Sequence, residues 1–157
     1  MTVRPKTIET ETEKLNAILL AFLKLPRMGR RTAQKLLLSR KPPESLEELV
    51  SRWKDGESIT YSELEDATDY ARKTFERSRK LKIHTLNIFS ESYPKRFREI
   101  DDPPILVHVL GSLESLNSPT SVAIIGTREP TSFGRQSARR IASSVAQIDA
   151  VVVSVLA

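Results

Sequence analysis

The sequence predicts an α/β protein in which a small helical unit precedes an incomplete βαβ domain. Apolar residues recur at helical spacing between residues 10 and 80, whereas short apolar stretches with strand character begin near residue 81. The last two of these stretches flank an amphipathic helix, and strands that alternate with helices are typical of a parallel sheet. We therefore expect a disordered tail over residues 1–9, a helical domain over 10–80 and the βαβ domain over 81–157.

The helical domain is defined by its capping and breaking signals. Patterns of the form Ser/Thr-x-x-Glu predict helix starts at Thr10, Ser45 and Thr60. The first of these helices is expected to end at Pro26, because proline disrupts a helix interior. A further helix is expected over Thr32–Leu38.

The second part is expected to contain strands near residues 83–89, 105–110, 122–125 and 150–155. A connector with a short helical turn follows the first of them. Between the last two strands, apolar residues at i, i+3, i+4 and i+7 predict a helix that covers a sheet. These residues are Ala138, Ile141, Ala142 and Val145.

Composition excludes several classes of function. The chain has no cysteine, so disulfides, thiol catalysis and cysteine-based zinc sites are excluded. No apolar run approaches the ~20 residues that cross a bilayer, and no secretory signal opens the chain. We expect a cytoplasmic protein without a membrane partner. His84 and His108 lack metal-ligand spacing, and we expect no catalytic residue, metal or cofactor.

A basic segment joins the first two predicted helices. Between Lys24 and Lys41 the chain carries seven Lys or Arg residues and no acidic residue. Such clustering favours a phosphate backbone as the partner, and a solvated basic turn is the alternative. The candidate DNA-backbone contacts are Arg27, Gly29, Arg30, Arg31, Thr32 and Lys35.

The stretch Leu25-Pro-Arg-Met-Gly-Arg-Arg-Thr-Ala-Gln-Lys-Leu-Leu resembles a helix-hairpin-helix element. That family reads roughly Leu-Pro-Gly-hydrophobic-Gly before a Thr-Ala helix start. Gly29 matches its second glycine, whereas Arg27 replaces the first. Such a turn exposes backbone N–H groups at a helix N-terminus, where a DNA phosphate can bind. The resemblance implies a contact to duplex DNA, and an ordinary corner between two helices is the alternative.

A strand–loop–helix segment over residues 121–134 predicts a phosphate site. The loop carries Gly126 and Arg128, and a helix that Ser132 is expected to cap follows it. Backbone N–H groups and a guanidinium can both bind phosphate there, and Arg135 or Arg139 adds charge from the helix. The segment is neither a Gly-x-Gly-x-x-Gly fingerprint nor a P-loop. A plain βα turn with a surface arginine is the alternative.

Three segments, which lie at residues 93–104, 122–134 and 151–157, carry a resemblance across residues 81–157 to the DNA-processing protein DprA (Smf) family. Tyr93-Pro94-x-x-Phe97-x-x-Ile100-x-Asp102-Pro103-Pro104 is similar to the segment before that family's Rossmann-like core. The stretch 122–134 looks like its Gly-Ser/Thr-Arg motif, and 151–157 looks like the next strand. The resemblance implies a helix-hairpin-helix or SAM-like unit followed by an incomplete Rossmann-like βαβ domain.

The resemblance also implies a function. Family members bind single-stranded DNA, act in DNA uptake during natural transformation and load a RecA-type recombinase, and no covalent chemistry is attributed to the motif. The loop would hold a DNA phosphate, Gly134 would shape the pocket and Ser154 would line it from the second strand. The candidate phosphate-binding residues are Gly126, Thr127, Arg128, Gly134, Arg135, Arg139 and Ser154.

Two departures from the family pattern bear on this function. Val155 replaces a glycine, and the family elements that should follow are absent from the sequence. We therefore expect a truncated protein with impaired function, which lacks the family's homodimer surface. A nucleotide-binding Rossmann-like enzyme or sensor is one alternative, although the sequence has neither the catalytic carboxylate nor the Gly-Gly loop that it would need. An interaction fragment in which only the helical unit folds is another.

Overall fold

The computed structural model describes residues 10–38, 41–54 and 56–154. The predicted tail 1–9, Arg40 of the basic segment and Val155 lie outside the described residues. Contacts divide the chain into two compact units, Met1–Gly111 and Ser112–Ala157, and each is described by itself.

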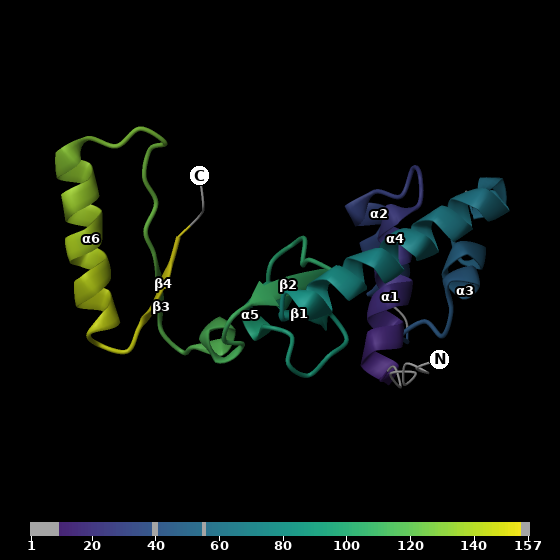
Figure 1. Ribbon diagram of the computed structural model, residues 1–157, viewed down its shortest axis with the longest axis horizontal. Coiled ribbons are helices and arrows are strands. Elements are labelled where there is room, and N and C mark those ends of the chain that lie inside the picture. Colours follow the sequence, from purple (N-terminus) through teal and green to yellow (C-terminus); the bar gives the residue numbers. More distant parts are fainter. Residues whose placement is uncertain (1–9, 39–40, 55, 155–157) are drawn as a thin grey trace, which may run out of the picture. The chain divides into compact units, whose positions relative to one another are not determined.

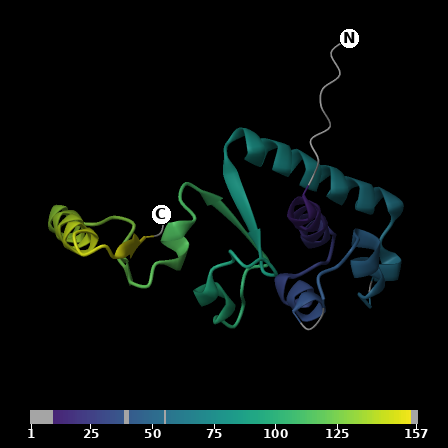
Figure 2. The same ribbon diagram turned by 90° about the horizontal axis from the view of Figure 1, so that it is seen from below.

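The first unit contains helices packed around a small apolar core (Figures 1 and 2). They are α1 (Glu11–Lys24), α2 (Arg30–Leu37), α3 (Leu46–Ser51), the 3-10 turn η1 (Gly56–Ser58) and α4 (Tyr61–Lys80). Leu19 and Phe22 of α1 are fully buried in this core. Helix α4 packs along α1, with Arg79 donating to Glu13 near one end and Lys24 over the Tyr70 ring near the other.

The predicted helix starts are confirmed. The hydroxyls of Thr10, Ser45 and Thr60 each accept from the backbone N–H three residues later. Thr10 and Thr60 form complete capping boxes, whereas Glu48 accepts from the Glu44 N–H rather than from that of Ser45. These caps satisfy N–H groups that the helices leave without internal partners.

A β-hairpin belongs to the same unit as the helices. Strand β1 (Ile83–Asn87) pairs antiparallel with β2 (Leu106–Leu110). The compact unit thus continues past the predicted boundary at residue 80, to Gly111. The reason is a buried amide pair: Asn16 of α1 donates to the Thr85 carbonyl at 3.0 Å, and Asn87 donates to Asn16 Oδ1 at 2.7 Å. Folding of residues 81–157 as a separate domain stays a prediction.

The connector between β1 and β2 turns the chain back on itself. It contains the short helix α5 (Lys95–Arg98), next to the buried Tyr93. The Tyr93 hydroxyl donates to the Pro104 carbonyl at 2.5 Å, and Arg98 lies over the Tyr93 ring. Burial raises the pKa of this hydroxyl, so it stays protonated and able to donate. These contacts fix both ends of the connector.

The second unit confirms the predicted parallel strand–helix–strand order. It contains the 3-10 turn η2 (Glu114–Asn117), β3 (Ser121–Ala123), α6 (Ser132–Ala146) and β4 (Val151–Val153). The pairing of β3 with β4 is parallel and runs from Ser121↔Val151 to Ala123↔Val153. Figure 1 shows α6 alongside the two strands. Parallel strands need such a crossover connection.

Two sequence predictions for α6 are wrong. Thr131, not Ser132, is the N-cap, and its hydroxyl accepts from the Gly134 N–H. Ile141 was expected to face inward but is 53% exposed, whereas Ala138 and Ala142 are half-buried. The pair of strands presents a surface that is too narrow for the whole apolar stripe of α6. No helix in the described part of the chain is long and apolar enough to cross a membrane.

We predict that Asn87→Ala destabilises the first unit by about 1–3 kcal/mol. The change leaves the buried Asn16 Oδ1 without its donor and the Phe89 N–H without its acceptor. Urea unfolding monitored by Trp53 fluorescence measures this loss. Asn117→Ala, which removes the same amide from an exposed site, should leave the unfolding midpoint unchanged. Equal midpoints for both variants would show that the amide pair does not stabilise the unit.

We also predict that the first unit loses stability as the pH falls below about 6.5. His108 lies beside the Phe75 ring, and its Nδ1 is 2.9 Å from Thr85 Oγ1. Partial desolvation of the ring lowers the pKa of His108 from its ordinary value of 6.5, so the unfolded chain takes up a proton first on acidification. Stability is therefore full above pH 6.5 and falls toward the lowered pKa. His108→Gln should reduce the pH dependence of the melting temperature over this range, whereas the same change at His84 of β1 should not.

Candidate nucleic-acid interface

The loop that follows β3 opens at the carboxyl edge of the parallel strand pair. The Ile124 N–H donates to the Val153 carbonyl at 2.9 Å, so the pairing continues to the start of the loop. Ser154 follows β4 directly and therefore lies at the same edge. Residues 125–131 are exposed and lead to the first turn of α6 (Figure 1). The structure thus brings Gly126, Arg128 and Ser154 to one end of this unit.

The N-terminus of α6 completes this end of the unit. The Thr131 hydroxyl accepts from the Gly134 N–H at 3.1 Å, and the Thr131 carbonyl accepts from the Arg135 N–H at 3.0 Å. The N–H groups of Ser132 and Phe133 belong to the first turn, which has no internal partners for them. Together with the positive end of the helix dipole, these groups favour an anion.

The two glycines of the motif differ in what surrounds them. A Cβ at Gly126 would meet no atom within 4 Å, so this position is open to an incoming group. A Cβ at Gly134 would lie 3.4 Å from Thr131 Oγ1 and 3.8 Å from the Pro130 Cβ. Gly134 therefore leaves room for the capping side chain, which the sequence interpretation had not anticipated.

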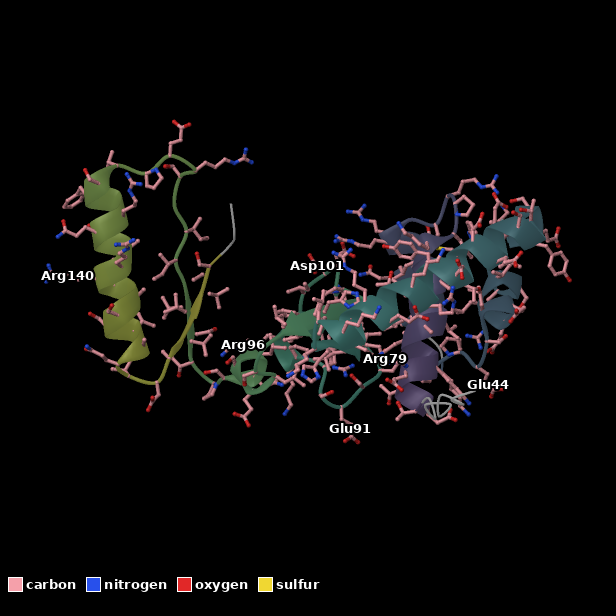
Figure 3. All side chains as sticks on the ribbon, viewed as in Figure 1. Glu44, Arg79, Glu91, Arg96, Asp101 and Arg140 are labelled. Atoms are coloured by element: carbon pink, nitrogen blue, oxygen red, sulfur yellow. The ribbon has the colours of Figure 1, made fainter. Side chains whose placement is uncertain are left out.

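The charge of this region is positive. Helix α6 carries Arg135, Arg139 and Arg140 and no acidic residue, while the loop carries Arg128 and Glu129. Arg128, Arg135 and Arg139 are exposed. Arg140 points away from the strands in Figure 3. The positive charges of this region therefore include cations near the loop and one cation, Arg140, on the side of α6 away from the strands.

The basic hairpin, which is the segment Arg27–Lys35 of the first unit, forms a tight turn without the first glycine of the helix-hairpin-helix pattern. Arg27 adopts the left-handed conformation, with φ of 63°, which costs a non-glycine residue about 1–2 kcal/mol. The Met28 N–H donates to the Leu25 carbonyl at 3.2 Å and closes the turn. The Arg27 guanidinium donates to Ser58 Oγ at 3.0 Å, which holds this conformation against η1. Gly29, with φ of −87°, is the N-cap of α2.

The hairpin cations lie at the start of α2. Arg30 and Arg31 occupy its first two positions and are exposed, Thr32 is half-buried and Lys35 follows one turn later. Arg30 forms an ion pair with Asp102 of the connector. An open hollow beside this pair is lined by Arg31, Gln34, Lys35, Leu38, Asp101 and Asp102.

Sequence reasoning missed several residues of these regions. The pairing of Asp102 with Arg30, a residue distant in the sequence, leaves no local signal. Tyr61 and Tyr70 are aromatic residues that the structure leaves 92% and 43% exposed. Tyr61 occupies the first position of α4, where its side chain extends beyond the helix packing. Within the described residues, no three metal-ligating side chains gather.

Comparison with known proteins finds similarity over the second half of the chain. The family described as DNA recombination-mediator protein A matches residues 84–157. The DNA processing protein DprA of Bacillus subtilis (strain 168) is 33% identical over 75 residues, which are 48% of this chain and 25% of that protein. The chain thus spans about a quarter of the length of this relative. The family match includes the connector, the loop after β3 and α6. On this evidence residues 84–157 are similar to the DNA recombination-mediator protein A family and to part of a DNA processing protein DprA.

Proposed function

We propose that the chain binds single-stranded DNA and belongs to the machinery of DNA uptake in natural transformation. In this proposal it binds without catalysing a reaction, and it delivers the strand to a RecA-type recombinase. The observation that carries the proposal is the exposed loop 125–131, which leads into the capped N-terminus of α6 inside the segment that matches the family. The names of the family and of the relative, which refer to recombination and DNA processing, support it.

In this proposal the loop contacts one DNA phosphate. Open space at Gly126 admits the phosphate to the backbone, and the Thr127 hydroxyl and the Arg128 guanidinium bind its oxygens. Arg135 and Arg139 attract the neighbouring phosphates, Ser154 offers a hydroxyl from β4, and Gly134 keeps the helix cap in place. Contacts of this kind bind the DNA backbone without reading sequence.

The basic hairpin is proposed as a second contact, to the backbone of duplex DNA. The N-cap Gly29, which follows the turn at Arg27, has no side chain to cap the first N–H groups of α2, and these groups belong to the turn that carries Arg30 and Arg31. This arrangement supports the helix-hairpin-helix interpretation, which stays a prediction.

A nucleotide-binding enzyme or sensor is the competing proposal, because a phosphate loop of this kind also suits a mononucleotide. The two proposals differ in the length of ligand that they require. A DNA-binding protein should bind longer oligonucleotides more tightly, since each further phosphate adds a contact. A mononucleotide that displaces a bound oligonucleotide at similar concentration would favour the sensor.

We predict that Arg128→Ala weakens binding to a labelled single-stranded oligonucleotide about tenfold at low salt. This is the effect of losing one charge-assisted hydrogen bond. The slope of log affinity against log salt should fall in magnitude by about 0.7, since one phosphate contact is lost. Fluorescence anisotropy over a salt series measures both quantities. Arg140→Ala, an equal charge change on the side of α6 away from the strands, is the control and should have the smaller effect.

We further predict that Arg30→Ala combined with Arg31→Ala weakens duplex binding more than single-strand binding. Up to two duplex phosphate contacts are removed, so the salt slope for a matched duplex should fall in magnitude by up to about 1.8. If this variant and Arg128→Ala both bind like the parent at low salt, the site assignment is wrong.

A further inference from the structure

Arg30, one of the proposed hairpin contacts, is already engaged by an acidic residue of its own unit. Its guanidinium forms an ion pair with the carboxylate of Asp102, which lies on the connector before β2. The Arg30 side chain is 68% exposed and that of Asp102 is 31% exposed. The pair therefore lies at the surface where a DNA backbone would approach the start of α2.

The connector holds Asp102 firmly beside the hairpin. The buried Gln34 of α2 donates to the Pro103 carbonyl at 2.8 Å, and the Tyr93 hydroxyl donates to the Pro104 carbonyl at 2.5 Å. Pro103 and Ile105 are buried. Because the residues that follow Asp102 are anchored in this way, its carboxylate cannot easily move away from the hairpin.

The surroundings of Asp102 make its charge effective. Its Oδ1 atom is buried and has no hydrogen-bond partner within the described residues. Asp101 and Asp102 line the same open hollow as Arg31 and Lys35. A phosphate that approached Arg30 would meet the Asp102 carboxylate at close range, and like charges repel strongly when they are partly desolvated.

We propose that Asp102 competes with DNA phosphate for Arg30 and thereby limits the affinity of the hairpin for duplex DNA. This inference rests on the proposed DNA contact of the hairpin. In free protein Arg30 is paired with Asp102, and binding of a phosphate to Arg30 requires that this pair opens. The carboxylate therefore favours ligands that supply several phosphates at once over single anions. The additional phosphate contacts of such ligands compensate for the lost ion pair.

The test is a comparison of charge-neutralising variants in the full chain. Asp102→Asn should tighten binding to a labelled duplex about two- to fivefold, the range expected for releasing a surface ion pair. It should also steepen the salt slope by up to about 0.9, because Arg30 then contributes a full phosphate contact. Asp101→Asn, which removes the same charge from the neighbouring residue labelled in Figure 3, is the control and should have the smaller effect.

A second background separates competition from a general change in charge. In the Arg30→Ala protein, Asp102→Asn should no longer tighten duplex binding more than Asp101→Asn does. The reason is that the guanidinium for which Asp102 and DNA phosphate compete is absent. Asp102→Ser repeats the comparison with a different side chain, and thermal melts establish that each variant is folded. An equal gain from Asp102→Asn with and without Arg30 would overturn the inference.

The outcomes also distinguish this inference from the proposed function. If removal of Arg30 and Arg31 weakens duplex binding but Asp102→Asn changes nothing, the hairpin contact stands and the competition is refuted. If removal of both arginines has no effect, the hairpin contact itself fails and the inference fails with it.

Discussion

The parallel pairing of β3 with β4 is the constraint on which the candidate site depends. Because the two strands run in the same direction, the loop that follows β3 and Ser154 after β4 open at one edge. The crossover through α6 then returns the chain so that the N-terminus of this helix meets the same loop. An antiparallel pair would have placed Ser154 at the opposite end from the loop, and the proposed phosphate site would lose its contribution from β4.

The arginines of the two units differ in whether they already have a side-chain partner. In the second unit, Arg128, Arg135 and Arg139 form no ion pair among the described residues, and α6 carries no acidic side chain. In the first unit, Arg27 is bonded to Ser58 and Arg30 to Asp102. The proposed phosphate contacts at the loop therefore require little rearrangement of existing ion pairs, whereas the proposed contact of Arg30 requires that its pair with Asp102 opens.

Local features of the structure could be predicted from the sequence, and long-range ones could not. The capping boxes depend on residues three apart, so the pattern alone predicted the starts of α1 and α4. The bond between Asn16 and Asn87, which ties the β-hairpin to the helices, joins residues with no shared local pattern. Both Thr131 and Ser132 have side chains that can cap a helix. The backbone conformation decides at which of the two adjacent residues α6 begins, and it makes Thr131 the N-cap.

The same division holds for the candidate site. The candidate phosphate motif could be predicted from the sequence because Gly126 and Arg128 lie close together between a strand and a helix. The pairing of Arg30 with Asp102 was not, because the connector that carries Asp102 is positioned by tertiary contacts such as Gln34 to Pro103. The sequence shows how many cations cluster in a segment. Whether each cation is available to a ligand depends on partners that only the fold brings together.

The central claim is that the loop after β3 and the start of α6 bind the phosphates of single-stranded DNA. Titration of isotope-labelled protein with an unlabelled single-stranded oligonucleotide, followed by the backbone amide resonances, tests it most directly. We predict that the largest shift changes fall on residues 126–135, weaken as salt is added and become stronger with oligonucleotide length. Shift changes confined to the first unit, or none at low salt, would contradict the claim.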